Sequence, residues 1–307
     1  MLSINNRRPA SIYSVIVLFN PDIPILARLV DSILNQVSHV LLVDNGSTNF
    51  LEMKAQIPES DKISHIALGD NYGIAKAHNV GIQTSRASGA SHVLIFDQDS
   101  YAPANLVEEL LKAEATLLER GEKVAAVGPS FFDPRTNNPY PFSKIDGFKL
   151  RSIYPSPENP VIEASFLISS GSLIRTEALE AVGLMREEFF IDYVDIEWCL
   201  RARSLGFKSF GVPGVSMEHS VGDNRLRVLG REISIHSPLR RYYLSRNGLL
   251  IIKLPYIPWK YKIRELSYSV SRVAVFLLFV PNKLRYLKYI SLGWAHGLLG
   301  KGGKFGA

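Results

Sequence analysis

The sequence contains a single cysteine, Cys199, among 307 residues. One cysteine cannot form an intramolecular disulfide, and no Cys/His spacing suits a structural zinc site. Long hydrophobic runs are also missing, because the longest one near the C-terminal end, residues 273–281, is about half of what a bilayer-spanning helix needs. The opening residues, MLSINNRRPA, are too few and too polar for a signal peptide. We therefore expect a protein of the cytosol, without disulfides or membrane spans.

Charge is distributed unevenly along the chain. Residues 225–307 hold 16 basic and 2 acidic residues, whereas residues 1–224 hold 19 basic and 27 acidic ones. The basic segment also contains 12 of the 31 aromatic residues. An acidic body followed by a basic, aromatic-rich segment indicates an anionic partner for that segment. We therefore expect two functional parts, a first domain over residues 1–224 and a C-terminal extension over residues 225–307.

The first domain alternates between strand-like and helix-like segments. Apolar, β-branched runs predict strands at residues 14–19, 39–43, 63–68, 92–96 and 124–128. Helical spacing of apolar residues follows Pro24 and Pro103, and a shorter helix ends near Ser85. Further along, the patterns predict a long loop at residues 129–160 and a strand at residues 161–175. They also predict two helices, at residues 175–182 and 193–205. Such alternation is typical of an α/β fold with a mostly parallel sheet between helices, which binds ligands at the carboxyl ends of its strands.

Two carboxylates, Asp97 and Asp99, flank Gln98 directly after the fourth predicted strand. Carboxylates at i and i+2 at a strand end can share a hard cation, which takes oxygen ligands and bridges phosphate oxygens. The alternative is a solvated turn, because a bare Asp-x-Asp arises often by chance. The position at a strand end favours the cation site.

Two other strand ends carry polar residues that suit a nucleotide. Asp44 precedes Asn45-Gly46-Ser47, where its carboxylate can accept hydrogen bonds from a base or ribose, or close an Asx-turn. Residues 71–79 place small side chains and a helix start where a diphosphate can approach. Because neither a Walker loop nor a G-x-G-x-x-G fingerprint is present, a P-loop site and a dinucleotide site are unsupported.

The acidic segment 192–201 holds the best candidate for a general base. Asp195 stands beside aromatic residues, an environment that can tune a carboxylate to accept a proton. Asp192 shares its predicted helix face at i−3 and is explained by the helix dipole. His219 becomes a candidate metal ligand if the fold brings it to Asp99. Cys199 faces the apolar side of the same helix, so we expect it in the core.

In this order, these clusters resemble the family 2 glycosyltransferases of the GT-A fold, particularly the bacterial rhamnosyltransferases. The resemblance covers roughly residues 12–250, and its ordered set of motifs is specific although each motif alone is weak. His219 belongs to the series. The matching segments are VIVLFNP (15–21), LLVDNGS (41–47), NYGIAKAHNVGI (71–82), FDQDS (96–100), SSGSLIR (169–175), FFIDYVDIEWCLRARSLG (189–206) and RYYLSRN (241–247).

The resemblance implies an inverting transfer of a sugar from a nucleotide-diphospho-sugar to an acceptor hydroxyl. By motif, Asp44 would contact the nucleotide base and Asp97 the ribose or the metal. Asp99 would bind Mg²⁺ or Mn²⁺ with His219 as a further ligand, and Asp195 would deprotonate the acceptor. The other donor-binding residues that the motifs imply are Phe19, Asn20, Asn71, Gly73, Lys76 and Gln98.

The subgroup that the chain resembles also suggests the substrates. It points to dTDP-L-rhamnose as the donor, while UDP-linked sugars remain open. The acceptor would be a cell-surface glycan precursor, such as lipopolysaccharide core or a lipid-linked oligosaccharide, at the cytoplasmic face of the inner membrane. Glu197 recurs in the family pattern, but the sequence offers no physical role for it.

The extension interleaves aromatic with basic residues, which suits helices lying peripherally in an anionic membrane interface. The alternative is an extension that packs on the first domain with a charged outer face. We expect no nucleic-acid partner, because no RNP-like, helix-turn-helix or zinc motif accompanies the basic residues.

Two other functions compete with sugar transfer. A sugar-phosphate nucleotidyltransferase requires a glycine-rich basic loop after the first strand, which residues 19–22 lack. A non-catalytic module that binds anionic lipid would leave the acidic strand ends without a purpose.

Overall fold

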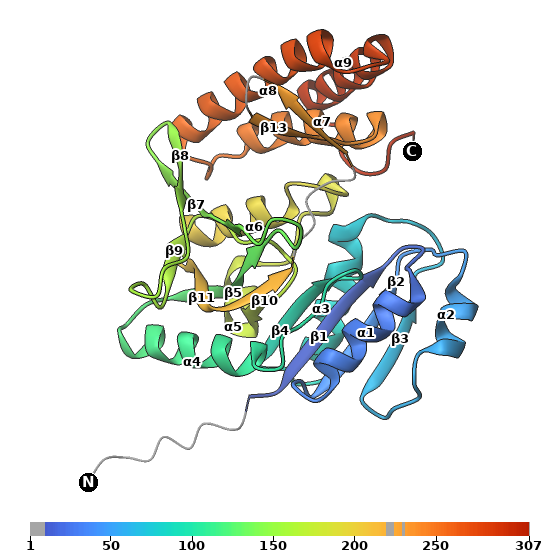
Figure 1. The fold of residues 1–307 in the computed structure, drawn as a ribbon, viewed down its shortest axis with the longest axis vertical. Coiled ribbons are helices and arrows are strands. Elements are labelled where there is room, and N and C mark those ends of the chain that lie inside the picture. The colour runs from blue at the N-terminus through green and yellow to red at the C-terminus, as the bar shows by residue number, and fades with distance from the viewer. Residues whose placement is uncertain (1–9, 219–223, 229–230, 307) are drawn as a thin grey trace.

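The computed structural model describes residues 10–218, 224–228 and 231–306. Its central sheet has the strand order β3-β2-β1-β4-β10-β5-β11-β9, with β6 beside β5 (Figure 1). Strands β1 to β4 run parallel, β11 is parallel to β5, and β10 is antiparallel to both β4 and β5. The strands are β1 (Ile12–Leu18), β2 (His39–Asp44), β3 (Ile63–Ala67), β4 (His92–Asp97), β5 (Val124–Phe132), β6 (Pro139–Tyr140), β9 (Ile162–Ala164), β10 (Ser172–Arg175) and β11 (Lys208–Glu218).

Helices cover both faces of this sheet. Successive side chains of β1 belong to two different hydrophobic cores, one on each face. Ile16 and Leu18 belong to a core shared with α1 (Ile23–Leu34) and α4 (Leu106–Glu119), and Val15 and Val17 to a core on the opposite face. A strand points successive side chains to opposite faces, so a continuous apolar run is buried on both. The opposite core includes residues of α3 (Ile74–Ala87), α5 (Thr176–Val182) and α6 (Val194–Ser204). The predicted mostly parallel α/β sheet is confirmed.

Local signals explain where these elements begin. Helix α1 starts after Asp22, whose carboxylate accepts a hydrogen bond from the amide of Ile25 at 3.1 Å, with Pro24 in the first turn. A short helix, α2 (Phe50–Gln56), follows β2, and a single 3-10 turn, η1 (Glu187–Phe189), precedes α6.

The prediction of a loop over residues 129–160 is wrong in part. The segment contains the end of β5, strand β6 and a hairpin of β7 (Phe142–Asp146) and β8 (Lys149–Ile153), which a two-residue turn closes. Gly147 in that turn has a φ of 61°, the left-handed conformation that glycine adopts without penalty. The single strand expected over residues 161–175 is two short strands, β9 and β10, which lie apart in the sheet.

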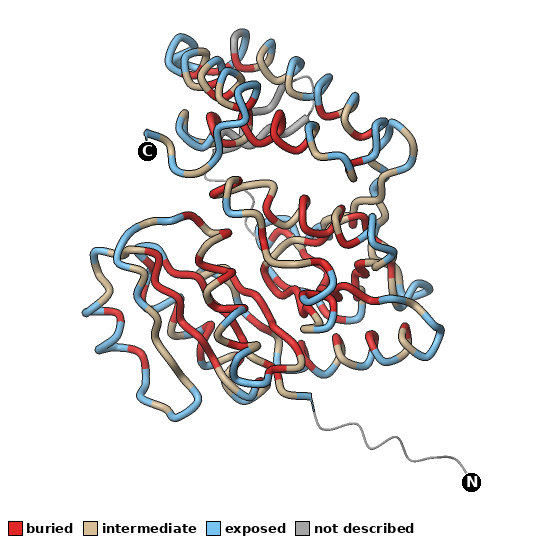
Figure 2. Tube along the Cα trace, turned by 180° about the vertical axis from the view of Figure 1, so that it is seen from behind, coloured by how far each residue is buried: buried red, intermediate tan, exposed pale blue. Residues whose placement is uncertain are grey.

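The extension forms a hairpin, β12 (Asn224–Val228) and β13 (Arg231–Ile235), followed by α7 (Pro238–Lys253), α8 (Trp259–Phe279) and α9 (Lys283–Leu299). In Figures 1 and 2 these helices form a layer at one end of the molecule, beyond α6. Helix α9 packs closely on α7 at Gly293. A Cβ at this position would lie only 2.6 Å from the carbonyl oxygen of Tyr242, so the contact requires glycine. Leu250, Ile251 and Tyr261 belong to the same core as the sheet, so the extension packs on the first domain.

Candidate active site

A cavity of about 250 Å³ opens at the carboxyl ends of β1 and β4. This is the edge at which parallel α/β sheets bind ligands. Five of the residues predicted to bind the donor line this cavity. They come from separate segments of the chain, so their proximity could not be read from the sequence. The lining consists of Val17, Phe19, Asn45, Asn71, Gly73, Ile74, Asp97, Gln98, Phe190 and Ile191.

Gln98 joins the ends of the two strands. Its Oε1 accepts a hydrogen bond from the amide of Phe19 at 2.7 Å, and its Nε2 donates to the carbonyl of Phe19 at 3.2 Å. Asn20 lies outside the cavity lining and holds the next loop, because its Oδ1 accepts hydrogen bonds from the amide and hydroxyl of Thr48 at 2.8 and 2.9 Å. Gln98 therefore shapes the cavity wall through backbone contacts, whereas Asn20 holds the loop that follows β2.

Asp44 is buried at the end of β2. Its carboxylate accepts hydrogen bonds from the amides of Gly46 at 3.2 Å and Ser47 at 3.1 Å, which is the Asx-turn that the sequence left open. Contact with the nucleotide base stays a prediction. The neighbouring Asn45 lines the cavity and donates to Asn71 Oδ1 at 3.1 Å, a role that the sequence reasoning missed.

Gly73 allows the loop before α6 to close on the start of α3. It has a φ of 88°, and a Cβ there would lie 2.5 Å from the ring of Phe190. The carbonyl of Phe190 accepts a hydrogen bond from the amide of Ile74 at 2.7 Å, and Asn71 Oδ1 accepts one from the amide of Gly73 at 3.0 Å. Phe190, which the sequence reasoning also missed, thus forms one wall of the cavity.

Lys76 lies in the first turn of α3 but does not line the cavity. Its ammonium group is 3.2 Å from the carboxylate of Glu187, and both side chains are about half exposed. A phosphate role for Lys76 stays a prediction that requires this ion pair to open.

The carboxylate of Asp97, at the end of β4, is influenced by two other acids. Burial, followed by the charges of Asp99 and Asp195, raises the pKa of Asp97 to about 7. Burial raises the pKa of Asp195 to about 6, although its carboxylate accepts a hydrogen bond from the amide of Ile196 at 2.8 Å. Ser170 connects this edge to β10, since its hydroxyl lies 2.6 Å from that of Ser100 and accepts from the amide of Asp97 at 3.3 Å. The charges of Asp99 and Asp195 thus both act on Asp97, which lines the cavity at the strand ends, here called the donor cavity. Asp195 itself lines a smaller neighbouring cavity with Ser169 and Cys199.

The donor set at Asp97 and Asp99 fits a hard cation. Oxygen ligands suit Mg²⁺ and Mn²⁺, and a bound cation would relieve the repulsion that disfavours the ionised form of Asp97. In residues 10–218, 224–228 and 231–306, no three His, Cys, Asp or Glu side chains come close enough to hold a metal ion. His219, the third predicted ligand, lies outside the described residues.

Helix α6 places Asp195 in its first turn, but the expectation for Asp192 is wrong. The helix begins at Val194, so Asp192 precedes it, with a φ of 62°, and its carboxylate pairs with Arg240 of α7 at 3.0 Å. Cys199 is buried, as predicted.

Glu197 has a structural role that the sequence did not reveal. Its side chain is fully buried, and Arg201 donates to its two carboxylate oxygens at 2.8 and 3.1 Å. The hydroxyl of Tyr256, between α7 and α8, also donates to this carboxylate. Glu197 therefore ties α6 to the extension and does not line the cavity.

The extension also holds the loop that leads into α6. Arg246 of α7 is fully buried and donates from Nη2 to the carbonyls of Glu188 and Phe189 at 3.1 and 2.9 Å. At the C-terminal end, the amide of Gly303 donates to the carbonyl of Glu188 at 2.8 Å, and Lys304 pairs with Asp70 at 2.9 Å. The extension thus contacts both loops that border the donor cavity.

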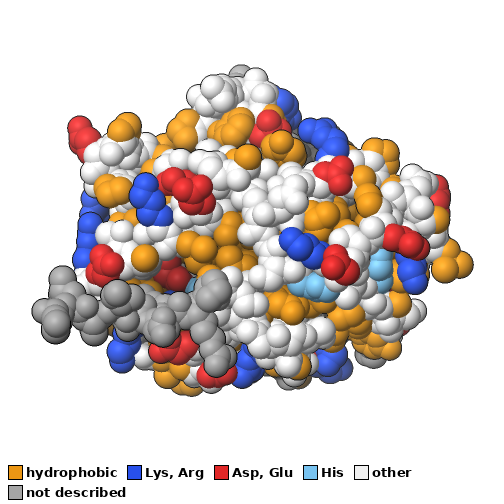
Figure 3. Space-filling model, turned by 90° about the horizontal axis from the view of Figure 1, so that it is seen from below, with side chains coloured by type: hydrophobic (Ala, Val, Ile, Leu, Met, Phe, Trp, Pro, Cys, Tyr) orange, Lys and Arg blue, Asp and Glu red, His pale blue; other side chains and the backbone are white. Residues whose placement is uncertain are grey.

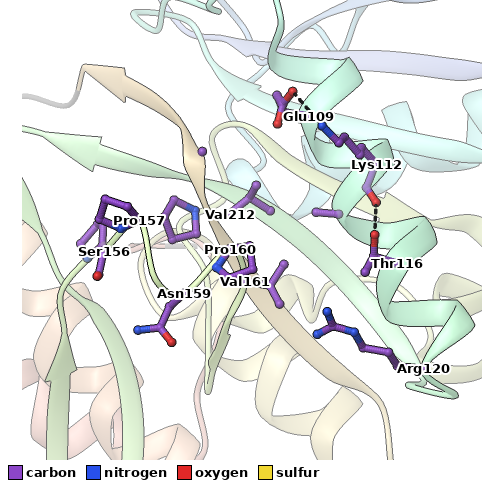
Figure 4. Close-up of a pocket in the computed structure, with 14 residues that line it drawn as sticks. Glu109, Lys112, Thr116, Arg120, Ser156, Pro157, Asn159, Pro160, Val161 and Val212 are labelled. Carbon is purple, nitrogen blue, oxygen red and sulfur yellow. Dashed lines mark hydrogen bonds and ion pairs between the residues drawn. The ribbon is translucent and has the colours of Figure 1, made fainter.

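A second cavity, of about 490 Å³, contains none of the predicted site residues. Figure 4 shows it between α4, with Glu109, Lys112, Thr116 and Arg120, and the segment from Ser156 to Val161. None of Asp97, Asp99 and Asp195 lines it, whereas Asp97 lines the smaller cavity at the strand ends.

Two known proteins are similar to this chain over most of its length, and a family profile matches its first part. The family profile described as "Glycosyl transferase family 2" matches residues 14–183. The "dTDP-rhamnosyl transferase RfbF" of Shigella flexneri is 36% identical over 97% of this chain and 99% of its own length. The "Low-salt glycan biosynthesis hexosyltransferase Agl10" of Haloferax volcanii is 23% identical over 87% of this chain and 85% of its own.

Solved structures share the fold at low sequence identity. TarS of S. aureus, residues 1–349 in complex with UDP-GlcNAc, aligns with a TM-score of 0.59 and 15% identity over 94% of this chain and 81% of its own. GalNAc-T7 with UDP, GalNAc and Mn²⁺ aligns with a TM-score of 0.55 and 14% identity over 89% of this chain, which spans only 58% of that protein. The family match and the full-length relative decide the identity: the chain belongs to glycosyltransferase family 2.

Proposed function

We propose that this glycosyltransferase transfers L-rhamnose from dTDP-L-rhamnose, with inversion, to a hydroxyl of a cell-surface glycan precursor such as lipopolysaccharide core or a lipid-linked oligosaccharide. The observation that carries the proposal is the place of Asp97 in the lining of the donor cavity, where the charges of Asp99 and Asp195 both act on it. The full-length relative whose name states dTDP-rhamnosyl transfer supports the choice of donor.

In the proposed reaction Asp195 is the general base. At neutral pH a carboxyl with a pKa of about 6 is mostly ionised, yet it accepts a proton more readily than an ordinary carboxylate. It takes the proton of the acceptor hydroxyl while that oxygen bonds to the anomeric carbon. The bond to the diphosphate oxygen breaks on the opposite face, and the nucleoside diphosphate leaves with the electron pair. Attack opposite to the leaving group inverts the anomeric centre.

The other site residues bind and orient the donor in this scheme. Asp97 and Asp99 would hold Mg²⁺ or Mn²⁺, with His219 as a further ligand. When bound, the cation would neutralise charge that develops on the diphosphate. Asn71, Gly73 and the wall formed by Phe190 would place the donor sugar against the edge that carries Asp195.

We further propose that residues 1–224 are the catalytic domain and that the extension contacts the cytoplasmic face of the inner membrane. On α8, four exposed apolar side chains follow at i, i+4, i+7 and i+11, which places them on one helix face: Trp259, Ile263, Leu266 and Val270. Lysines and arginines on α8 and α9 accompany this stripe, a combination that suits an anionic interface.

The opposite end of the molecule differs from this surface. Figure 3 shows there acidic and basic side chains interspersed with hydrophobic ones, without a region of one sign. No helix in the described part of the chain has both the length and the apolar character to cross a bilayer.

Thermal-shift measurements with dTDP, UDP, GDP and ADP, each with Mn²⁺ and with EDTA, test the proposal. A ligand that binds only the folded state raises the melting temperature by mass action. We expect a metal-dependent rise that is largest with dTDP and that Asp99→Asn removes. A preference for UDP would change the donor, and no shift with any nucleotide would refute the proposal.

A further inference from the structure

Glu265 is a buried acid in a strongly basic part of the chain. It is one of 2 acidic residues among residues 225–307, and in α8 it is 4% exposed. Its Oε1 accepts a hydrogen bond from the hydroxyl of Tyr193, and a guanidinium nitrogen of Arg264 lies 3.7 Å from its Oε2. Burial of a carboxylate is unfavourable unless it is paired and hydrogen-bonded, so the interaction with Tyr193 helps to keep Glu265 in the interior.

Tyr193 stands where α6 begins. It precedes Val194, the first helical residue, and has a φ of 65°, the left-handed conformation. Its carbonyl accepts a hydrogen bond from the amide of Glu197 at 2.9 Å. Left-handed residues other than glycine are strained, and they persist only where the surrounding structure fixes them. Asp195 follows two residues later, so whatever fixes Tyr193 also fixes the first turn that carries Asp195.

Glu265 completes an anchoring of this loop that α7 begins. The side-chain amide of Asn247 donates to the carbonyl of Asp192 at 3.0 Å, and Tyr193 is the next residue along the chain. Gly248 of α7 lies beside the hydrogen bond of Tyr193, because a Cβ built there would lie 3.4 Å from Tyr193 Oη and 3.5 Å from Glu265 Oε1. The bond is thus flanked by α7 and α8, and a hydrogen bond to a carboxylate is stronger in such low-dielectric surroundings than in water.

We propose that Glu265 is a positioning residue for the general base. By accepting the hydrogen bond of Tyr193, it holds the start of α6 and with it the carboxylate of Asp195. The inference rests on the proposed function, in which Asp195 takes the proton of the acceptor hydroxyl, and it gives the extension a part in the reaction. A base must stay within hydrogen-bond reach of that hydroxyl, and a displacement of about 1 Å can lower the rate about a hundredfold. Neither Glu265 nor Tyr193 lines the donor cavity, so loss of the bond should lower kcat and spare donor binding.

Two variants of the full-length protein test the inference. Tyr193→Phe removes only the hydroxyl, and Glu265→Ala removes the carboxylate. Hydrolysis of dTDP-L-rhamnose with Mn²⁺, in which water takes the place of the acceptor, measures kcat and KM. We expect each variant to lower kcat about tenfold or more and to leave KM unchanged. Amide hydrogen exchange across residues 191–197 should become faster in both, because the start of α6 loses its anchor.

Three further variants separate the hydrogen bond from general packing. Glu265→Gln keeps an oxygen that accepts from Tyr193, so it should restore most of the rate lost in Glu265→Ala. The double variant Tyr193→Phe/Glu265→Ala should be no slower than Glu265→Ala alone, because both changes remove the same interaction. Tyr286→Phe is the matched control, since the hydroxyl of this buried tyrosine in α9 donates to the carbonyl of His236 at 3.0 Å. Its loss should change neither kcat nor the exchange at residues 191–197.

A Tyr193→Phe enzyme with wild-type kcat would overturn the inference. So would a Glu265→Gln enzyme as slow as Glu265→Ala, or a loss in Tyr286→Phe as large as in Tyr193→Phe. A higher KM with wild-type kcat would assign the pair to donor binding, with the same consequence. If Glu265→Ala fails to fold, Tyr193→Phe still decides, since it retains the whole ring. A wild type that neither binds dTDP nor hydrolyses dTDP-L-rhamnose would instead refute the proposed function, while hydrogen exchange would still show whether Glu265 holds the start of α6.

Discussion

The side-chain amide of Asn247 in α7 donates a hydrogen bond to the carbonyl oxygen of Ile191 at 2.7 Å, four residues before Asp195. The same nitrogen lies 2.9 Å from the carbonyl oxygen of Phe189. Around these carbonyls, Phe190, Asp192 and Tyr193 all have positive φ angles, which are costly for residues other than glycine. The extension therefore stabilises the strained loop that delivers the proposed base to the sheet edge.

Replacing Asn247 with alanine should reveal this coupling. Asn247→Ala leaves buried carbonyl groups without their donor, so we expect the free energy of unfolding to fall by about 1–3 kcal/mol. Because the loop leads into α6, kcat should also fall, which steady-state transfer assays on the folded variant measure. Asn138→Ala removes an exposed amide in the turn before β6 and is the matched control. A folded Asn247→Ala enzyme with wild-type kcat would contradict the role we assign to α7.

A methyl group at Gly73 should damage the donor cavity. In Gly73→Ala the new Cβ would meet the Phe190 ring and carbonyl, which must move out of the cavity wall. We expect dTDP affinity, measured by calorimetry, to fall at least tenfold. Gly69→Ala is the matched control, since Gly69 has a similar φ of 82° but nothing within 4 Å of its added Cβ. Equal losses in both variants would mean that backbone strain, not contact with Phe190, is responsible.

The rate of transfer should depend on the ionisation of Asp195. Because the raised pKa of Asp195 is about 6, kcat/KM should decline as the pH falls below about 6, tenfold for each further unit. Asp195→Asn should lower kcat by about 10²–10⁴-fold, and the small residual rate should lose this acidic limb. An unshifted acidic limb in Asp195→Asn would assign the titration to another group.

The same pKa has a consequence for stability. A carboxyl whose pKa is raised by folding contributes stability below its unfolded pKa, and that contribution disappears as the pH rises through about 6. In EDTA at pH 7.5, Asp195→Asn should therefore be more stable than the wild type, by at most about 3 kcal/mol. At pH 4 the advantage should shrink. Chemical denaturation measures the free energy of unfolding of both proteins at the two pH values. An Asp195→Asn variant less stable than the wild type at pH 7.5 would contradict burial as the cause of the raised pKa.

A charge within the apolar stripe of α8 should weaken membrane binding. Leu266 is 48% exposed, and Leu266→Glu places a carboxylate where we propose the bilayer interface. Inserting one leucine side chain contributes about 1.5–3 kcal/mol to membrane binding. Its loss should lower the affinity for anionic vesicles, measured by co-sedimentation, at least tenfold. Leu205, 50% exposed at the end of α6, provides the control Leu205→Glu. Equal effects of both substitutions would argue against a membrane face on α8.

Much of the first domain follows from local sequence. Apolar runs located the parallel strands, and the polar residues after them proved to share one edge, because parallel strands end on the same side of a sheet. The hairpin of β7 and β8 was missed, although Asp146-Gly147 is a turn signal, because its strands are mostly polar and lack a buried alternating face. Asp192 was placed on a helix that begins two residues later, since left-handed residues other than glycine leave no local pattern.

The sequence by itself determined the α/β class, the family and half of the residues that line the donor cavity, since apolar periodicity and strand-end motifs are local properties. Only the tertiary structure decided what Glu197, Arg246 and Asn247 do. Each of them bonds to groups that its own segment does not contain, and those partners come near only when the chain has folded. The tertiary structure likewise buries Arg241, whose Nε and Nη1 have no hydrogen-bond partner among the described residues, because burial depends on every element packed around a side chain.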